Sequence, residues 1–207
     1  MRRIVKMGLF FEAATAWNNM CDVTYILDIA RNGTMKRIEL SFLAEDFPHL
    51  AGMQYARDVD FGMRPAEYYG DQLLPALLSG QMDDTKIEKS RMWERISGRL
   101  NAIVNLQETL DGDFVIASFD KTKVKGYSQL NAHYVIKSLI SEEMYFVFLD
   151  EQSGRYYCKS AFKKEKTDYV CNQAVMTMLQ KTKVQKGEAN ILYTRPGYTP
   201  EAQESPE

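Results

Sequence analysis

Cysteine and histidine are scarce in this 207-residue chain, and their scarcity excludes several kinds of chemistry. The three cysteines, Cys21, Cys158 and Cys171, are odd in number and have no paired spacing, which excludes a disulfide framework and a zinc motif. Neither of the two histidines has a second ligand at helical or strand spacing, so we expect no metal site and no cofactor. Free thiols are typical of a reducing compartment, and we expect a cytoplasmic protein.

Long hydrophobic runs and glycine-rich loops are also missing. No stretch of about eighteen apolar residues is present, and the Met-Arg-Arg start is not followed by the apolar core of a signal peptide, so we expect no membrane partner. The glycines lack the spacing of a phosphate-binding loop, and there is no Gly-x-Ser-x-Gly elbow. Nucleotide-binding and serine-hydrolase chemistries are therefore not indicated.

The composition is that of a globular protein with an uneven charge distribution. Hydrophobic residues make up 45% of the chain and aromatic residues 12%, which is enough for a sizeable core. The net charge of −2 excludes a globally basic surface. Residues 155–195, however, carry nine Lys or Arg against three acids, whereas the last twelve residues contribute −3. This local excess gives weak support for a polyanionic partner.

Helical patterns dominate the first half of the chain. Residues 9–20 form a short helix in this prediction, and Asn32-Gly33 indicates a hairpin between strands at 22–30 and 35–42. Residues 66–78 are predicted to be helical with a bend near Pro75, and a long helix is predicted over 84–110.

Strand patterns dominate the second half. The segment 131–140 suits a strand or a helix, and the other predicted strands are 114–119, 144–150, 155–162 and 174–184. This segregation predicts the α+β class, with N-terminal helices and a β-hairpin followed by a mostly antiparallel sheet. We expect residues 1–195 to form a single domain, and residues 196–207 to form a disordered acidic tail.

The best candidate for acid–base chemistry is His49, in Phe47-Pro48-His49-Leu50-Ala51-Gly52-Met53. A histidine held between apolar anchors at a core edge can carry a proton near neutral pH. Arg99 lies beside the apolar stripe of the predicted long helix and could neutralise a phosphate. Ser160 and Lys159 lie on a predicted strand, where one side chain faces a cleft. The sequence leaves the role of His133 open.

A series of motifs resembles a known family. The chain is similar to the fourth subgroup of the phage-associated barnase–EndoU–colicin–RelE-like nucleases, found in bacteria, phages and mobile elements, over roughly residues 10–185. The residues that carry the resemblance are Phe47-x-His49-Leu50-x-Gly52, Lys89-Ser90-x-Met92-x-x-Arg95-Ile96-x-x-Arg99-Leu100, Tyr145-Phe146-x-Phe148-Leu149 and Tyr157-Cys158-x-Ser160-x-Phe162.

The resemblance implies a toxin-like ribonuclease that cleaves RNA by transesterification without a metal ion. It implies that His49 transfers the proton, with Arg99 and Ser160 as its active-site companions. The residues expected to bind substrate are Arg95, Tyr157, Lys159 and Lys163. The expected partners are RNA, with transfer RNA as one candidate, and a protein that neutralises the activity. This mechanism requires His49, Arg99 and Ser160 to converge in one cleft.

Two other interpretations stay open at this point. The chain could be a catalytically inactive module of phage or mobile-element origin that binds nucleic acid or protein through the surface from Lys159 to Lys186, with strongly salt-dependent affinity. It could also be a structural protein in which His49 only bonds a backbone carbonyl at a helix start. The sequence does not determine the oligomeric state.

Overall fold

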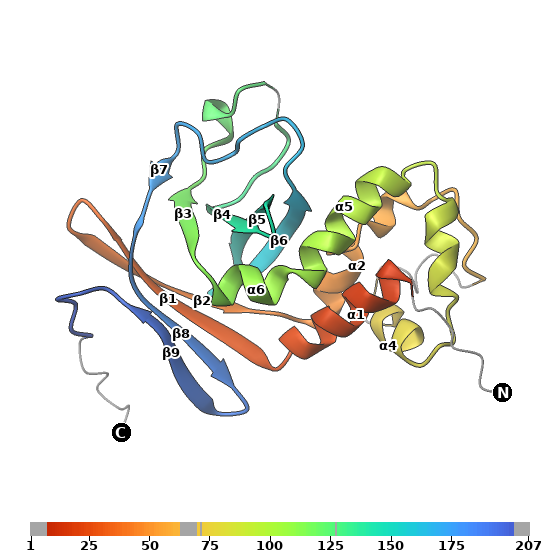
Figure 1. Cartoon of the computed structure of the whole chain (residues 1–207), viewed down its shortest axis with the longest axis horizontal. Helices are drawn as coiled ribbons and strands as arrows, with labels where there is room; N and C mark the ends of the chain where they lie inside the picture. Colours follow the sequence, from red (N-terminus) through yellow and green to blue (C-terminus); the bar gives the residue numbers. More distant parts are fainter. Residues whose placement is uncertain (1–7, 63–69, 71, 127, 201–207) are drawn as a thin grey trace.

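The computed structural model describes residues 8–62, 70, 72–126 and 128–200, and these form an α+β fold. Helices gather at one end, and a large curled sheet of nine strands makes up the rest (Figure 1). The α+β class predicted from the sequence is therefore confirmed.

The N-terminal helix and hairpin form where the sequence predicts them. Helix α1 spans Leu9–Met20, strand β1 spans Val23–Arg31 and strand β2 spans Thr34–Ser41. The turn residues Asn32 and Gly33 have φ of 50° and 79°, the left-handed pair that a two-residue hairpin of this twist requires.

The helical part is more broken than the sequence predicts. Its elements are η1 (Ala44–Asp46), α2 (Phe47–Leu50), η2 (Met53–Tyr55), α4 (Leu73–Leu78), η3 (Asp84–Lys89), α5 (Trp93–Val104) and α6 (Leu106–Asp111). The first residues of the helix predicted over 66–78 lie outside the described part of the chain. Its last residues form α4.

The prediction of a single long helix over 84–110 is wrong. The Asp58 carboxylate accepts hydrogen bonds from the Ser90 hydroxyl and the Arg91 amide, both at 2.8 Å, which end one helix and start the next. A second break follows at Asn105, whose φ of −92° and ψ of 5° separate α5 from α6. A carboxylate 32 residues away along the chain therefore overrides the local helical pattern.

The remaining strands follow the predicted order with one addition. They are β3 (Phe114–Ser118), β4 (Tyr134–Ile140), β5 (Glu143–Gln152), β6 (Arg155–Lys163), β7 (Ala174–Val175), β8 (Thr177–Gln185) and β9 (Glu188–Thr194), with η4 (Lys121–Lys123) after β3. The ambiguous segment 131–140 is thus a strand, the strand predicted over 174–184 is divided in two, and β9 was not predicted.

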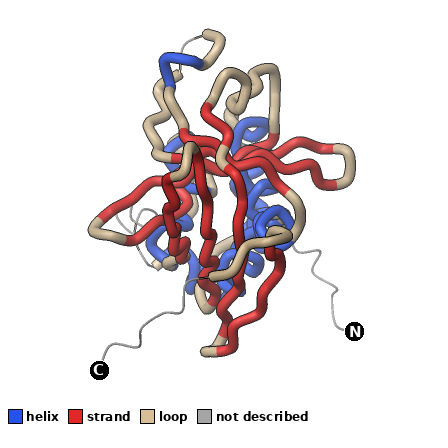
Figure 2. The backbone as a smooth tube through the Cα atoms, turned by 90° about the vertical axis from the view of Figure 1, so that its left-hand side faces the viewer, coloured by secondary structure: helices blue, strands red, loops and turns tan. Residues whose placement is uncertain are grey.

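All nine strands form one sheet in the order β7-β3-β4-β5-β6-β2-β1-β8-β9. Neighbouring strands pair antiparallel except β2 and β6, which run parallel and pair at Leu40 and Tyr156. Figure 2 shows the strands in front and most of the helices behind them. Because β2 and β6 pair over a short length, the rest of the β6 edge is left to the helices, and α5 and α2 pack there.

Two hydrophobic cores lie on opposite faces of the central strands. The larger core joins the helices to the sheet and contains Trp17, which packs edge-on against Phe42 at 5.5 Å between ring centroids. The smaller core lies on the other face, where Phe148 packs against Phe119 and Tyr169 from the connecting segments. The junction of β6 with α5 therefore lies where both cores meet.

Candidate active site

His49 is the one side chain of α2 that faces outward. Phe47, Pro48 and Leu50 are buried, and the Phe47 ring stacks on Phe10 at 6.0 Å. Proline in the first turn suits the start of this short helix because its missing N–H has no partner to lose there. The apolar anchors thus hold α2 in the core and present His49 at its surface.

Gly52 joins this motif to the neighbouring helix. Its φ of +85° lies in the left-handed region that favours glycine. A Cβ atom added at this position would also lie 3.1 Å from the Arg99 Cδ atom, which is closer than most side-chain contacts. The glycine of the His-Leu-x-Gly element is therefore needed both for the turn and for the approach of Arg99.

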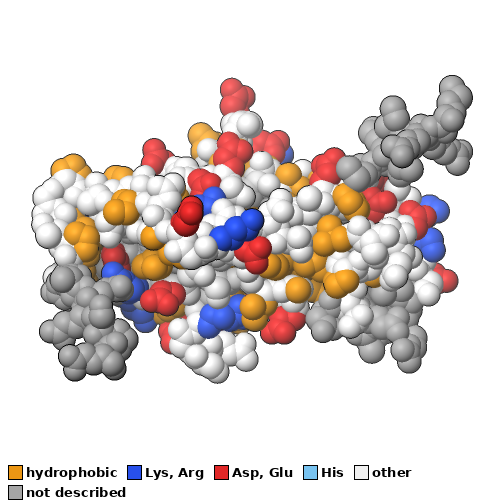
Figure 3. All heavy atoms as spheres, turned by 90° about the horizontal axis from the view of Figure 1, so that it is seen from below, with side chains coloured by type: hydrophobic (Ala, Val, Ile, Leu, Met, Phe, Trp, Pro, Cys, Tyr) orange, Lys and Arg blue, Asp and Glu red, His pale blue; other side chains and the backbone are white. Residues whose placement is uncertain are grey.

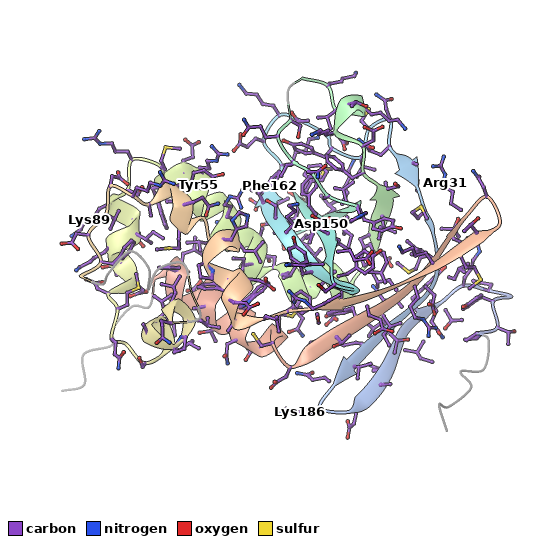
Figure 4. The ribbon with its side chains drawn as sticks, turned by 180° about the vertical axis from the view of Figure 1, so that it is seen from behind. Arg31, Tyr55, Lys89, Asp150, Phe162 and Lys186 are labelled. Carbon is purple, nitrogen blue, oxygen red and sulfur yellow. The ribbon has the colours of Figure 1, made fainter. Side chains whose placement is uncertain are left out.

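Arg99 lies on α5, almost covered, at 7% exposure. Its guanidinium carbon is 5.3 Å from the centre of the Tyr55 ring and 6.0 Å from that of Phe162. Figure 4 shows these two aromatic residues at the junction between the helices and β6. Burial lowers the pKa of Arg99, against an opposing effect of Tyr55. The buried Arg99 Nη1 has no hydrogen-bond partner among the described residues, so a donor is available for an anion.

Lys159 is set apart from the rest of β6 by a bulge. Phe148 pairs with Ser160 and Leu149 pairs with Cys158, which leaves Lys159 as an extra residue in the strand. Bulges commonly redirect a side chain next to a functional site. The Lys159 ammonium forms an ion pair with Asp150 on β5, which is labelled in Figure 4.

His49 lies near both cations, because α2 packs against α5, which carries Arg99, and against β6, which carries Lys159. Burial by the surrounding atoms is the main cause that lowers the pKa of His49, and the charges of Arg99 and Lys159 lower it further. Asp46 and a hydrogen bond to the Lys159 backbone act in the opposite direction. Such a bond fixes the imidazole, as a backbone carbonyl commonly does for a working histidine, and it is also the contact expected of a structural one.

The other residues predicted for the site differ in their accessibility and contacts. Ser160 follows Lys159 in the strand but is 2% exposed, and its Oγ atom is buried with no hydrogen-bond partner in the described structure. Arg95 is exposed and lies over the Tyr55 ring at 4.1 Å, on the rim of the site.

Lys163 and Tyr157 have contacts away from His49. The Lys163 ammonium is 2.5 Å from a Glu143 carboxylate oxygen. The Tyr157 ring packs under Arg155 at 5.4 Å. The structure therefore brings together His49, Arg99 and Lys159, with Arg95 on the rim and Ser160 beneath the surface.

Sequence reasoning missed Tyr55, Phe162 and Asp150 as neighbours of this cluster. Tyr55 follows Gly52 by three residues, and Phe162 closes the Ser-x-Phe element, so both were within quoted or adjacent motifs. Asp150 ends an apolar strand, which is a weak signal, because acids often end strands at the surface. Its contact with Lys159 depends on the bulge, and the sequence does not indicate that bulge.

Within the described residues, no group of three or more His, Cys, Asp or Glu side chains is arranged to hold a metal ion. None of the described helices is long and apolar enough to cross a membrane. Acidic, basic and apolar side chains are interspersed on the face shown in Figure 3, which is therefore not a surface of one charge.

Comparison with known proteins gives one match. The family model described as PBECR4, phage-Barnase-EndoU-ColicinE5/D-RelE like nuclease4, matches residues 10–195. No curated protein matches the chain, and no solved structure does. The matched region contains all the described helices and strands except the first residue of α1.

Proposed function

The chain belongs to the PBECR4 family of phage-type, barnase–EndoU–colicin–RelE-like nucleases, and on that premise we propose that it is a metal-independent endoribonuclease. The observation that supports the proposal is that α2, α5 and β6, which carry His49, Arg99 and Lys159, pack against one another. One imidazole beside two cations is a set of groups suited to moving a proton and neutralising a phosphate.

In the proposed reaction His49 accepts the proton of a ribose 2′-hydroxyl. The 2′-oxygen then attacks the adjacent phosphorus, and the bond from phosphorus to the 5′-oxygen breaks. Because burial and two cations lower the pKa of His49, the imidazole is neutral at pH 7 and can accept this proton. General base catalysis of this kind contributes about 10²–10⁴-fold.

Arg99 and Lys159 stabilise the charge that develops on the pentavalent phosphate. The unpartnered Arg99 Nη1 supplies a hydrogen bond that no described residue uses, and its low exposure strengthens the interaction because little water competes. Removing one such donor typically costs about 10²–10³-fold in rate. The buried Ser160 side chain lies beneath this cluster, where we assign it to packing rather than to contacting a phosphate.

The rim of the site suits a single-stranded RNA substrate. The exposed Arg95 guanidinium lies over the Tyr55 ring at 4.1 Å, and a planar cation held in this way can contact a base or a phosphate of the strand. Tyr157 and Lys163 would contact more distant nucleotides. Transfer RNA is a candidate substrate, and a neutralising protein would bind over the same rim.

The alternative, an inactive binding module, would use the basic C-terminal surface. Ion pairs reduce the free positive charge there, because Lys159, Lys163 and Lys183 pair with Asp150, Glu143 and Asp111. Lys181 is buried, and its ammonium donates to three backbone carbonyls. These contacts favour a localised site over a broad basic face.

The proposal is tested by incubating the purified chain with total RNA and transfer RNA in EDTA, alongside His49→Ala. We expect cleavage by the wild type and loss of about 10²–10⁴-fold in the variant, with an unchanged melting temperature. Tight, salt-dependent RNA binding without cleavage would support the binding module instead. A His49→Ala variant that melts earlier but cleaves normally would indicate a structural histidine.

A further inference from the structure

The second histidine, His133, is linked to Lys159 through Asp150. The His133 Nδ1 atom is 2.7 Å from an Asp150 carboxylate oxygen, and the other oxygen of Asp150 pairs with Lys159. The backbone of Lys159 in turn is hydrogen-bonded to His49. His133, Asp150, Lys159 and His49 are therefore linked in that order across β5 and β6.

The backbone and ring of His133 are held in place. Its amide donates to the Leu149 carbonyl and its carbonyl accepts from the Phe119 amide, both at 2.9 Å, just before β4 begins. The ring meets the Tyr156 ring edge-on at 6.3 Å. The side chain is nevertheless 55% exposed, and Asp150 engages only Nδ1. The Nε2 atom is thus available to a ligand.

The proposed reaction needs a second proton-transfer group. When the bond from phosphorus to the 5′-oxygen breaks, the leaving oxygen must receive a proton, and His49 has at that stage only taken one from the 2′-hydroxyl. Lys159 is engaged by Asp150, and Arg99 does not release protons in this range. Among the described histidine, lysine and arginine side chains of the cluster, His133 is left as the group that can donate.

We propose that His133 is the catalytic general acid of this site and that Asp150 is its positioning residue. The inference rests on the proposed ribonuclease function. The Nε2–H of protonated His133 goes to the 5′-oxygen as the phosphorus–oxygen bond breaks, and the electron pair of that bond stays with the oxygen. The Asp150 carboxylate accepts from Nδ1, which sets the tautomer and stabilises the imidazolium.

The groups around His133 fit this role. Asp150 comes from β5, Lys159 and Tyr156 come from β6, and the Lys36 ammonium of β2 lies over the Tyr156 ring at 5.3 Å. Burial acts to raise the pKa of Asp150, but hydrogen bonds from Lys159, the Glu151 backbone and His133 outweigh it and lower that pKa. Asp150 is therefore anionic at neutral pH and can support a positive imidazole.

The test for a general acid compares the normal substrate with one whose leaving group needs no proton. The cleavage site is first mapped on a short RNA, and a second RNA then carries sulfur in place of the bridging 5′-oxygen at that site. A thiolate leaves without protonation, so loss of the general acid slows the oxygen substrate and spares the sulfur substrate. A merely structural role of the residue would slow both equally.

The variants are His133→Ala and His133→Gln, since Gln keeps a donor toward Asp150 but transfers no proton. We expect both to slow the oxygen substrate by about 10²–10⁴-fold and to cleave the sulfur substrate within about 10-fold of wild type. His49→Ala should be slow on both substrates. Equal loss on both substrates, or no loss, would overturn the role of His133 alone. A wild type that cleaves neither substrate would overturn the proposed function and this inference together.

Discussion

Replacing Gly52 with alanine tests whether the His-Leu-x-Gly element positions Arg99. Alanine at a φ of +85° costs about 1–2 kcal/mol of backbone strain, part of which is offset by the lower chain entropy of the unfolded state. We therefore expect Gly52→Ala to lower the free energy of unfolding by about 1 kcal/mol. Urea unfolding followed by tryptophan fluorescence measures this change.

The same substitution should disturb catalysis through Arg99. The new Cβ atom would lie 3.1 Å from the Arg99 Cδ atom, so the side chain must move by a few tenths of an ångström. A misplacement of about 1 Å can cost about 10²-fold in rate, and a shift of this smaller size should cost on the order of 10-fold in kcat/KM. RNA cleavage at a temperature where the variant stays folded measures the effect.

Gly80→Ala is the matched control. Gly80 has a φ of +73°, and a Cβ atom there would meet nothing within 4 Å. We expect a similar loss of stability with cleavage unchanged. Equal loss of cleavage in both variants, or full activity of Gly52→Ala, would refute the reasoning that the glycine sets the position of Arg99.

Four further predictions follow from single side chains. Arg99→Met removes a buried charge, so the free energy of unfolding should hold or rise while RNA cleavage falls about 10²–10³-fold; a large loss of stability would contradict this. Ser160→Ala removes a buried hydroxyl without a partner, and denaturant unfolding should show a gain of about 1 kcal/mol rather than a loss. Because the pKa of His49 is lowered, the neutral base persists to acidic pH, and the acid limb of the kcat/KM profile should have a midpoint below about 6.5; a midpoint above that value would contradict its role as the base. Lys181→Met leaves three carbonyls at the end of α6 without their donor and should cost about 2–4 kcal/mol in denaturant unfolding; cleavage by the folded variant should be unchanged, and a selective loss of cleavage would place Lys181 in the site.

Elements defined by local chemistry could be predicted from the sequence. Asn32-Gly33 forms the turn of one hairpin and Ser153-Gly154 that of another, because each pair adopts the two positive φ values that the turn needs. The turn at Lys186-Gly187 has the same geometry, with φ of 51° and 82°, and its weaker first residue explains why β9 was not predicted.

Elements defined by distant contacts could not be predicted. The break before α5 depends on Asp58, and the pairing of β2 with β6 brings Leu40 to Tyr156. In the site, the motif and the apolar stripe identified His49 and Arg99 as candidates. The contact of Lys159 with Asp150 depends on a bulge in β6. That bulge arises from the pairing of β6 with β5 and is not visible in the residues of β6 alone.

The central claim is that the chain cleaves RNA by attack of the 2′-hydroxyl, without a metal ion, at the site centred on His49. The most direct measurement compares a short RNA with the same RNA carrying one 2′-deoxy residue at the mapped cleavage site, both in EDTA. The account predicts cleavage of the first with 2′,3′-cyclic phosphate ends, and no cleavage of the second at that position. Equal cleavage of both, or cleavage only after a divalent metal ion is added, would contradict it.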